Sequence, residues 1–441
     1  MATKRREPEA SVVRSPNQNY REGFGGMTTP ARDHRTDHRW YMAGLWSYFL
    51  AGGIQGVLFP WIIAYVLHES PDRVGIAQMF SMLPMLLLGL FGGAAADRAE
   101  LRKHLMRLQA IAMLPPLALA LLIYNGILFY ELMILYVLAL SSLGGYIMPA
   151  RDSMLSRVAT QSMGGNIQRA VALAMSGQFL GQVVGYALGS PAEYIGAWPL
   201  LILQSSLLGF AAFTTSRLEP APPSPRAEKR RQPIKDVKEG LAAVWHDERI
   251  RPVLLLMFFS GILFMGVFMV LFPILIRDVY HGSSQEIGFV FMSFFGGIGI
   301  SSFVLSRLKP IRRQGRAIML AMCTGAVVMV FIHFEPPIWG VFLLAHCWGL
   351  AAGVSMSQSR AIVQERASDA LRARMLAGFN LGTMGGGPIG SVLIGFLIAG
   401  VGPLDAVLLP SALMLVLWVA IFLFTPLWRI EAPKPNQSAH G

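Results

Sequence analysis

The chain has 441 residues, of which 54% are hydrophobic and only 14% charged, and this composition excludes an ordinary soluble domain and a disordered chain and favours a membrane protein. The net charge of +12 would suit nucleic acid only if the basic residues shared one face with aromatic side chains between them. Here they lie in short tracts between apolar runs, so we expect no nucleic-acid partner and assign the charge to membrane orientation.

The chain begins with a basic tail. Residues 1–39 contain arginine, lysine, proline, glycine and asparagine but no apolar core, which is typical of a disordered cytoplasmic tail and not of a cleavable signal peptide. The two cysteines, Cys323 and Cys347, lie inside later apolar runs. We therefore expect neither a disulfide framework nor a thiolate metal site.

Twelve apolar stretches follow the tail, each long enough for a helix to cross the hydrocarbon core of a bilayer, which takes roughly 17 to 25 residues. They contain no Asp, Glu, Lys or Arg. They are residues 41–66, 76–96, 108–124, 132–150, 170–189, 194–216, 252–276, 287–306, 317–334, 337–359, 375–401 and 406–428. Short alternating segments, as in a β-barrel, are not the pattern, so the sequence predicts an all-α membrane protein with twelve transmembrane helices.

The basic residues alternate between the loops. With the N-terminus inside, 35 of the 37 Lys and Arg residues fall in the tails and inner loops, and only Arg73 and Arg277 fall outside. Cytoplasmic loops are enriched in Lys and Arg, so this distribution predicts an even number of spans with both termini in the cytoplasm.

The longest loop divides the spans into six and six. We expect a disordered tail at 1–39, an N-terminal six-helix bundle at 40–216, a cytoplasmic linker at 217–251, a C-terminal six-helix bundle at 252–428 and a cytoplasmic tail at 429–441. Within the linker, IKDVKEGLAAVWHDERIRP has Leu241, Val244 and Trp245 on one face. This pattern predicts an interfacial helix beneath the bundle, with a partner-binding helix as the alternative.

The fifth and eleventh spans share a pattern of glycines at every fourth residue, which predicts that the two halves are similar copies. The matched glycines are Gly177, Gly181 and Gly185 in the fifth span and Gly382, Gly386 and Gly390 in the eleventh. Such glycines give a helix a smooth face. They indicate either tight packing alone or an interface at which the two halves move against each other.

The loop after the second span reads GGAAADRAELRKHL and resembles the signature of the major facilitator superfamily. In that signature three residues separate a glycine from Asp-Arg, and basic residues follow. Here these residues are Gly93, Asp97, Arg98 and Arg102. The second glycine of the signature is absent, and Glu100 stands near its place. The loop after the eighth span keeps only the basic residues.

Other stretches are similar to one branch of that superfamily, the exporters that resemble the enterobactin exporter and the macrolide efflux pumps. The stretches are GIAQMFSMLPMLLLGLFGGAAADR, PARDSMLSRV and KEGLAAVWHDERIRPVLLL, and together with two short motifs around the seventh and eighth spans they cover roughly residues 40 to 428. In this branch the fifth span usually has Gly-Pro where this chain has Gly181-Gln182, while Gly387-Pro388 appears in the eleventh span.

The resemblance implies a major facilitator fold of two pseudo-symmetric six-helix bundles, which exposes a central site to each side of the membrane in turn. It also implies a conformational latch formed by Gly93, Asp97, Arg98 and Arg102. In this latch Asp97, at the inner end of the second span, would face the positive end of a helix from the other half, which we expect to be the eleventh span. An ordinary interfacial pair of Asp97 with Arg98 is the alternative.

Uncharged polar residues at mid-depth are the candidates for the substrate cavity, because in the family arrangement their spans line or flank it. They are Gln55, Ser141, Ser142, Gln178, Gln182, His346, Asn380 and Thr383. Hydrogen bonding between helices would explain each of them equally well. Since the spans hold no carboxylate, His346 is the candidate for proton coupling, with a neutral packing role as the alternative.

We therefore expect a secondary active transporter that exports a small amphipathic organic compound, such as a siderophore, drug or metabolite, by alternating access, with proton antiport implied by the family. The alternatives are an importer or lysolipid flippase of the same fold, and a membrane scaffold or sensor without transport. No phosphate-binding lysine accompanies the glycine-rich runs, and no paired carboxylates, metal-spaced histidines or activated Ser or Cys stand together. We expect no enzyme activity, cofactor or metal, and a monomer in a bacterial inner membrane.

Overall fold

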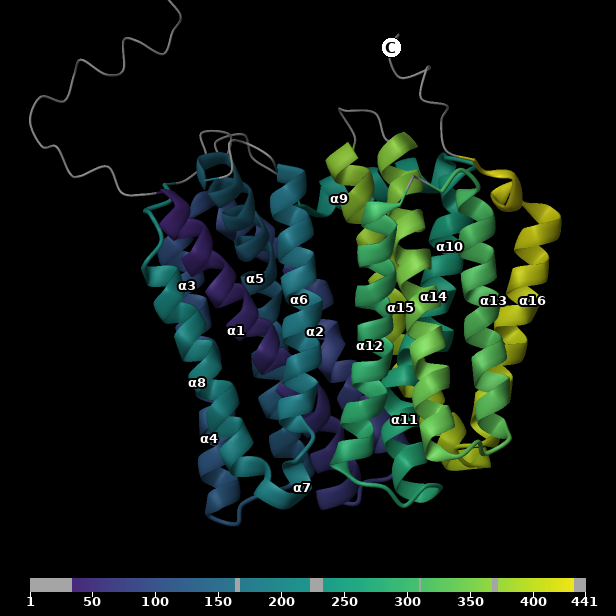
Figure 1. Ribbon diagram of the computed structural model, residues 1–441, viewed down its shortest axis with the longest axis horizontal. Helices are drawn as coiled ribbons and strands as arrows, with labels where there is room; N and C mark the ends of the chain where they lie inside the picture. The colour runs from purple at the N-terminus through teal and green to yellow at the C-terminus, as the bar shows by residue number, and fades with distance from the viewer. Residues whose placement is uncertain (1–33, 163–166, 223–232, 309–310, 367–371, 432–441) are drawn as a thin grey trace, which may run out of the picture.

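The computed structural model describes residues 34–162, 167–222, 233–308, 311–366 and 372–431, and these are almost entirely helical. The long helices run side by side and form two groups, with the first half of the chain in one group and the second half in the other (Figure 1). This arrangement satisfies the backbone hydrogen bonds of each span within its own helix, which a span inside lipid requires.

The described residues of the first half form eight α-helices and one π-helical turn that continues α1. They are α1 (His34–Trp61), η1 (Ile62–Val66), α2 (Pro71–Arg98), α3 (Leu101–Ala112), α4 (Leu114–Tyr124), α5 (Tyr130–Ser162), α6 (Ile167–Gly189), α7 (Ala192–Ile195) and α8 (Ala197–Ser216). Helices α3 and α4 together form one apolar span, because the short break at Met113 leaves the chain helical on both sides.

The second half repeats this plan after a linker that contains α9 (Pro233–His246). Its elements are α10 (Ile250–Ser260), η3 (Gly261–Met265), α11 (Gly266–Asp278), α12 (Ser284–Arg307), α13 (Gln314–His333), α14 (Ile338–Arg366), α15 (Arg372–Val401), η4 (Asp405–Val407), α16 (Leu408–Phe424) and η5 (Leu427–Arg429). A single span runs from α10 through the π-helical turn η3 to α11. Among the described residues, eleven helices are long and apolar enough to cross a membrane, which confirms the predicted class. The fifth predicted span corresponds to α6, which runs beside the other helices in Figure 1.

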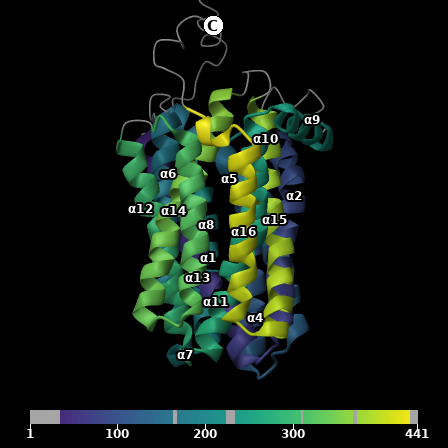
Figure 2. The same ribbon diagram turned by 90° about the vertical axis from the view of Figure 1, so that its right-hand side faces the viewer.

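Two names for the ends of the bundle are used below. The terminal face is the end at which α1 begins and at which α9 lies, and the distal face is the opposite end, at which α2 begins and α7 lies (Figure 1). Helices from the two halves pack along each other at two places, α2 beside α15 and α6 beside α12. The first of these pairs is visible in Figure 2.

The glycines of the matched pattern form contacts within each half and not between the halves. A Cβ placed on Gly185 would lie 2.8 Å from the Cα of Gly53 in α1, and Gly177 and Gly181 face Trp46 and Phe49 of the same helix. The interpretation of these glycines as an interface between moving halves is therefore wrong, because α1 and α6 belong to one half. They allow two helices of that half to approach closely.

The second half uses its glycines in the same way. Gly382, Gly386 and Gly390 of α15 face residues of α10 and η3, and a Cβ on Gly386 would lie 2.7 Å from the backbone nitrogen of Ile262. The fifth span thus packs on the first, and the eleventh packs on the seventh, through equivalent glycines. This supports the internal repeat that the sequence predicts.

A buried charge lies directly beyond the predicted end of the fourth span. The fourth predicted span ends at Ala150, directly before Arg151. In the structure α5 continues past both residues, and the side chain of Arg151 is buried. The first half therefore holds a buried cation that the spans as predicted do not include.

Candidate functional site

The distal face is held shut by an arginine that reaches from one half to the other. Arg277, the penultimate residue of α11, donates from Nη1 to the carbonyl oxygens of Ala64 at 2.8 Å and of Glu69 at 3.1 Å. Its Nε and Nη2 donate to the carboxylate of Asp278 at 2.5 and 3.0 Å. Asp278 therefore orients the guanidinium so that its remaining nitrogen faces the other half. We call Arg277, Asp278, Ala64 and Glu69 the distal clasp.

The acceptors of the distal clasp suit a cation. Ala64 lies in the last turn of η1, where carbonyl groups lack a partner within the helix, and the C-terminal end of a helix carries partial negative charge. A hydrogen bond from a charged donor contributes about 1.5–3 kcal/mol. The two bonds of Arg277 can therefore bias the equilibrium between a closed and an open distal face.

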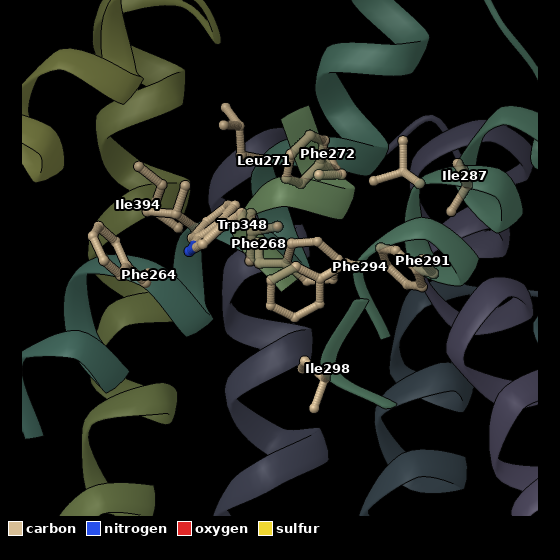
Figure 3. Close-up of a cluster of buried hydrophobic side chains, with 14 of the residues drawn as sticks. Phe264, Phe268, Leu271, Phe272, Ile287, Phe291, Phe294, Ile298, Trp348 and Ile394 are labelled. Carbon is tan, nitrogen blue, oxygen red and sulfur yellow. The ribbon is translucent and has the colours of Figure 1, made fainter. Parts of the chain in front are cut away.

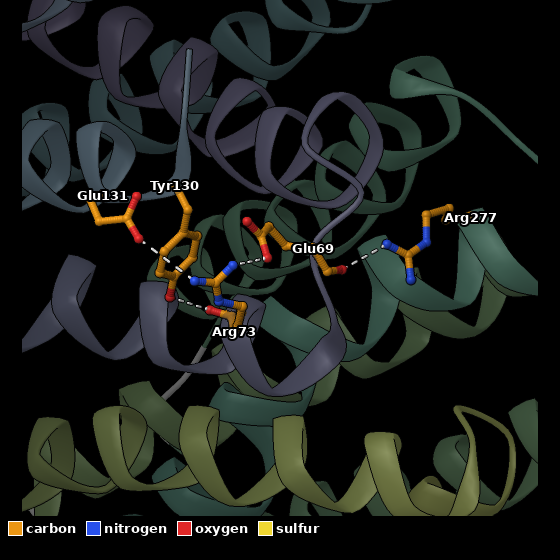
Figure 4. Close-up of polar contacts among 5 residues, drawn as sticks. All are labelled: Glu69, Arg73, Tyr130, Glu131 and Arg277. Atoms are coloured by element: carbon orange, nitrogen blue, oxygen red, sulfur yellow. Dashed lines mark hydrogen bonds and ion pairs between the residues drawn. The ribbon is translucent and has the colours of Figure 1, made fainter.

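A second arginine fixes Glu69 from its own half (Figure 4). Arg73, in the first turn of α2, donates to the Glu69 carboxylate at 2.7 Å and lies 3.7 Å from that of Glu131. Its guanidinium lies 4.3 Å from the centroid of the Tyr130 ring, and the Tyr130 hydroxyl donates to the Arg73 carbonyl at 2.8 Å. Arg73 and Arg277 are the two basic residues that the sequence places outside, and both meet at Glu69.

Helices α6 and α12 meet at the same face through small residues. The Ser284 hydroxyl donates to the carbonyl of Ser190 at 2.6 Å and accepts from the backbone nitrogen of Glu193 at 3.0 Å. One turn further along α12, a Cβ on Gly288 would lie 3.0 Å from the Cβ of Ser190. Close approach of the two halves therefore depends on glycine and serine at these positions.

Helices α2 and α15 also approach closely at the distal face. A Cβ on Gly395 would lie 2.7 Å from the carbonyl oxygen of Pro71 and 3.1 Å from the Cα of Gly75. Gly75 and Gly395, with Gly288, are the glycines at which the halves touch at this face. The sequence analysis missed them because they belong to no regular repeat.

An aromatic cluster stands behind this closure (Figure 3). Phe268 of α11 stacks on Phe294 of α12 with ring centroids 4.1 Å apart, and Trp348 of α14 lies edge-on to both. Tyr186 joins the cluster from the first half, with its ring centroid 5.5 Å from that of Phe291. The buried rings form a rigid support on which α6 rests.

The signature loop at the terminal face holds the start of the linker. The Glu100 carboxylate accepts from the backbone nitrogens of Lys103 at 3.0 Å and Ala221 at 2.8 Å, and so caps α3. The Ala221 carbonyl accepts in turn from the backbone nitrogen of Leu101 at 2.8 Å. Burial raises the pKa of Glu100, but the backbone donors and nearby Arg102 outweigh it and hold the pKa below its usual range. Glu100, which replaces the second glycine of the signature, thus has a structural role of its own.

The other predicted latch residues lie around this loop. Arg102 donates from Nη1 to the carbonyl of Leu218 at 3.2 Å, and Arg98 is exposed. Gly93 and Asp97 are partly exposed on the last turns of α2. Arg102 therefore contacts the linker of its own half. The interaction of Asp97 with the eleventh span stays a prediction.

The linker helix α9 covers the terminal end of α15. A Cβ on Gly378 would lie 2.7 Å from the backbone nitrogen of Leu241, and Val244 is fully buried. Leu241 and Trp245 are exposed. The helix predicted to lie beneath the bundle is therefore docked on it through Val244 and Gly240, while part of its apolar face stays uncovered.

The predicted cavity residues have varied surroundings. Ser141 is buried and accepts from the backbone nitrogen of Met85 at 3.2 Å, which is a contact between α5 and α2. Gln182 donates to the Tyr186 hydroxyl at 2.9 Å, and the Thr383 hydroxyl donates to the carbonyl of Asn380 at 2.9 Å. Asn380 is exposed; the remaining partly exposed members are Gln55, Ser142, Gln178 and His346.

His346 forms a hydrogen bond within its own half. Its Nδ1 lies 3.0 Å from the carbonyl oxygen of Ser293, so Nδ1 carries the proton and α14 is joined to α12. This contact fits a packing role. The protonation of Nε2, on which proton coupling would depend, stays a prediction.

The sequence analysis missed Arg151. The residue is 4% exposed, and its guanidinium lies 4.3 Å from the centroid of the Phe49 ring in α1. Arg151 donates no hydrogen bond from Nε or Nη1 within the described part of the chain. A buried cation in a membrane-spanning helix is a sign of function, and the residues 149–152, Pro-Ala-Arg-Asp, concealed it by resembling a loop.

Comparison with known protein families identifies the family of this chain. The model of the Major Facilitator Superfamily matches residues 41–369 and, in a second match, residues 254–441. This chain belongs to the major facilitator superfamily. The second match begins at the start of the second half, as the internal repeat requires.

Two relatives of this major facilitator protein are similar along most of their length. The multidrug efflux pump Tap of Mycolicibacterium fortuitum is 28% identical over 393 residues, which cover 86% of this chain and 92% of Tap. The enterobactin exporter EntS of Shigella boydii is 25% identical over 401 residues, which cover 88% of this chain and 91% of EntS.

Solved structures agree with the major facilitator fold. The nucleoside transporter NupG superposes with a TM-score of 0.69 at 15% identity, covering 88% of this chain and 98% of NupG. A bacterial homologue of the human lysosomal transporter Spinster superposes with a TM-score of 0.65 at 13% identity, covering 89% of this chain and 96% of that homologue. At these identities the likeness concerns the fold alone.

We predict that Arg277→Gln opens the distal face. Loss of two charged hydrogen bonds should shift the ratio of closed to open molecules at least tenfold toward open. Spin labels on the exposed positions Tyr194→Cys and Trp339→Cys, in a variant without Cys323 and Cys347, would report the separation of the halves by electron paramagnetic resonance. A distance distribution identical to that of the parent protein would contradict the role of the distal clasp, and Arg312→Gln, at the opposite face, is the matched control.

Proposed function

We propose that this major facilitator protein is a secondary active exporter of a small amphipathic organic compound and works by alternating access. The observation that carries the proposal is the closure of one face by contacts between the halves. Arg277, Ser284, Gly288 and Gly395 all contribute to it at the distal face. Rocking of two halves about a central site requires such a separable contact at one end.

The charge distribution supports an orientation. The tails and loops predicted to lie inside carry nearly all the lysine and arginine, which favours a cytoplasmic terminal face. A protein in this orientation with its distal face closed would receive its substrate from the cytoplasm. The names of Tap and EntS, an efflux pump and an exporter, support the outward direction.

Flux in proteoliposomes of known orientation would test this function. We expect siderophores, macrolides or lysolipids to move from the terminal side to the distal side, and to move faster when the distal side is made acidic. Gly288→Val should slow the flux by blocking distal closure, whereas Gly296→Val, where a Cβ meets nothing within 4 Å, is the matched control on the same helix. Uptake in the opposite direction, or no flux of any compound through folded protein, would reject the exporter.

We further propose that Asp97 latches the terminal face when the distal face opens. Helix α2 ends at Arg98 and α15 begins at Arg372, and the two helices pack along each other (Figure 2). A carboxylate beside the first turn of a helix is favoured by about 0.3–1 kcal/mol, and up to about 2 kcal/mol when partly buried.

Asp97→Asn should therefore leave the protein folded and inserted but slow transport severalfold. The measurement is the initial rate of flux in the same vesicles, normalised to the amount of inserted protein. Asp72→Asn, at the other end of α2, is the matched control. A normal rate in Asp97→Asn would remove the latch.

We propose His346 as the proton-coupling residue. We expect His346→Ala to exchange labelled for unlabelled substrate at the parent rate and to lose the acceleration by a pH gradient. His333→Ala is the control, because the Nδ1 of His333 also lies near a backbone carbonyl, that of Leu404, at 3.1 Å. Undiminished flux driven by the pH gradient in His346→Ala would assign this histidine to packing between α14 and α12.

A further inference from the structure

Arg151 is a buried cation inside the first half. Its guanidinium lies 4.3 Å from the Phe49 ring centroid and 5.3 Å from that of Tyr48, and its backbone carbonyl accepts from the Tyr41 hydroxyl at 3.2 Å. Tyr48 lies seven residues beyond Tyr41, where the predicted first span begins, so its Cα is about 10 Å inside that span at 1.5 Å per residue. The charge therefore lies toward the terminal face, as the backbone of Arg151 does.

The hydrogen-bonding groups of Arg151 are largely unused. The Nε and Nη1 atoms are buried and have no hydrogen-bond partner in the described residues. The Nη2 atom lies 3.8 Å from a carboxylate oxygen of Asp152, whose side chain is 73% exposed while that of Arg151 is 5% exposed. The Asp152 carboxylate thus lies toward the surface, and the Nε and Nη1 donors of Arg151 stay unsatisfied.

An unsatisfied buried guanidinium is costly to keep. Two aromatic rings stabilise the cation, each by up to about 2 kcal/mol when water is excluded, but they do not accept the in-plane N–H groups of the fork. Removing a charge from water costs several kcal/mol unless it is paired. A folded protein has reason to retain such a group where a ligand supplies the missing acceptor during its working cycle.

Space for an acceptor adjoins the two rings. A Cβ placed on Gly52, one turn along α1 from Tyr48, meets no atom within 4 Å. On α5, a Cβ placed on Gly144 would find the Tyr48 hydroxyl oxygen as its nearest neighbour, at 3.9 Å. The side of Tyr48 that faces these glycines is therefore loosely filled.

We propose that Arg151 binds an anionic group of the exported compound, with Tyr48 and Phe49 beside the adjoining aromatic or apolar part. A carboxylate or a similar oxyanion can accept charge-assisted hydrogen bonds from Nε and Nη1, which lie on opposite sides of the guanidinium and donate in different directions. This inference rests on the proposed export function and narrows its substrate class to amphipathic anions. It also makes the binding region charged, where the sequence predicted a polar but uncharged cavity.

The test uses two dyes with the same xanthene ring system and opposite charge, the anion fluorescein and the cation rhodamine 123. Their binding to the full-length protein in lipid nanodiscs is measured by fluorescence anisotropy. We expect the parent protein to prefer fluorescein. Arg151→Gln should weaken fluorescein binding at least tenfold without weakening that of rhodamine 123, and Arg151→Lys, which keeps the charge but loses the fork, should fall between.

Three results would overturn the proposal: no binding of fluorescein to the parent protein, unchanged binding to Arg151→Gln, or equal weakening of both dyes. Arg151→Met tests the structural explanation separately. Because a buried unpaired charge is removed, its melting temperature should equal or exceed that of the parent protein, whereas a packing role requires a fall.

Flux of the same dyes through proteoliposomes separates this inference from the export function. If the parent protein binds fluorescein through Arg151 but moves neither dye nor any other compound, the exporter is rejected and the anion site stands. If it moves both dyes and Arg151→Gln moves them equally well, the exporter stands and the anion site is rejected.

Discussion

A polar group inside a bilayer has no water to bind, and this constraint governs both the fold and the contacts by which the fold can change shape. Within each span the helix itself satisfies the backbone. The exceptions lie where helices end, and there the structure supplies charged partners from elsewhere in the chain. Arg277 satisfies carbonyls at the end of η1 in the other half, and Glu100 satisfies nitrogens at the start of α3 and in the linker. The hydrogen bonds of Arg277 join the two halves, so they must break when the halves separate. The ends of the helices are therefore the natural places for a conformational switch.

The two faces are built differently. At the distal face the halves touch directly. Arg277 reaches across from one half to the other, and a pair of serines and three glycines leave room for very close approach. At the terminal face α9 lies against the end of α15, and the linker start is bonded to the signature loop of the first half. A movement of the first half must therefore carry residues 217–222 with it. The linker is thus a structural part of both bundles at this face.

The fold could be predicted from the sequence, but only part of the candidate site could. Apolar run length and the alternation of charge predict the spans, since lipid imposes both along the chain. Glycine spacing predicts that Gly181 and Gly386 each lie on a smooth helix face. It does not tell which helix covers that face, so the sequence left packing within one half and contact between the halves as alternatives. The distal clasp could not be predicted from the sequence for a similar reason. Its acceptors are backbone carbonyls, which every residue possesses, so only the three-dimensional arrangement distinguishes Ala64 and Glu69.

Arg151 shows how one local error changes the chemistry of a whole site. Proline followed by charged residues normally marks the end of a span, yet α5 accommodates Pro149 and continues, which carries a guanidinium into the bundle. If Arg151 lay in a loop, the spans would contain no charged side chain, and substrate recognition would depend on amide and hydroxyl groups alone. With it inside, the two halves differ in kind. The first holds a buried cation beside Tyr48 and Phe49, and the second holds the buried aromatic cluster around Phe268. If Arg151 binds the exported compound as proposed, that compound needs an anionic end beside an apolar or aromatic part, which is the physical meaning of an amphipathic substrate.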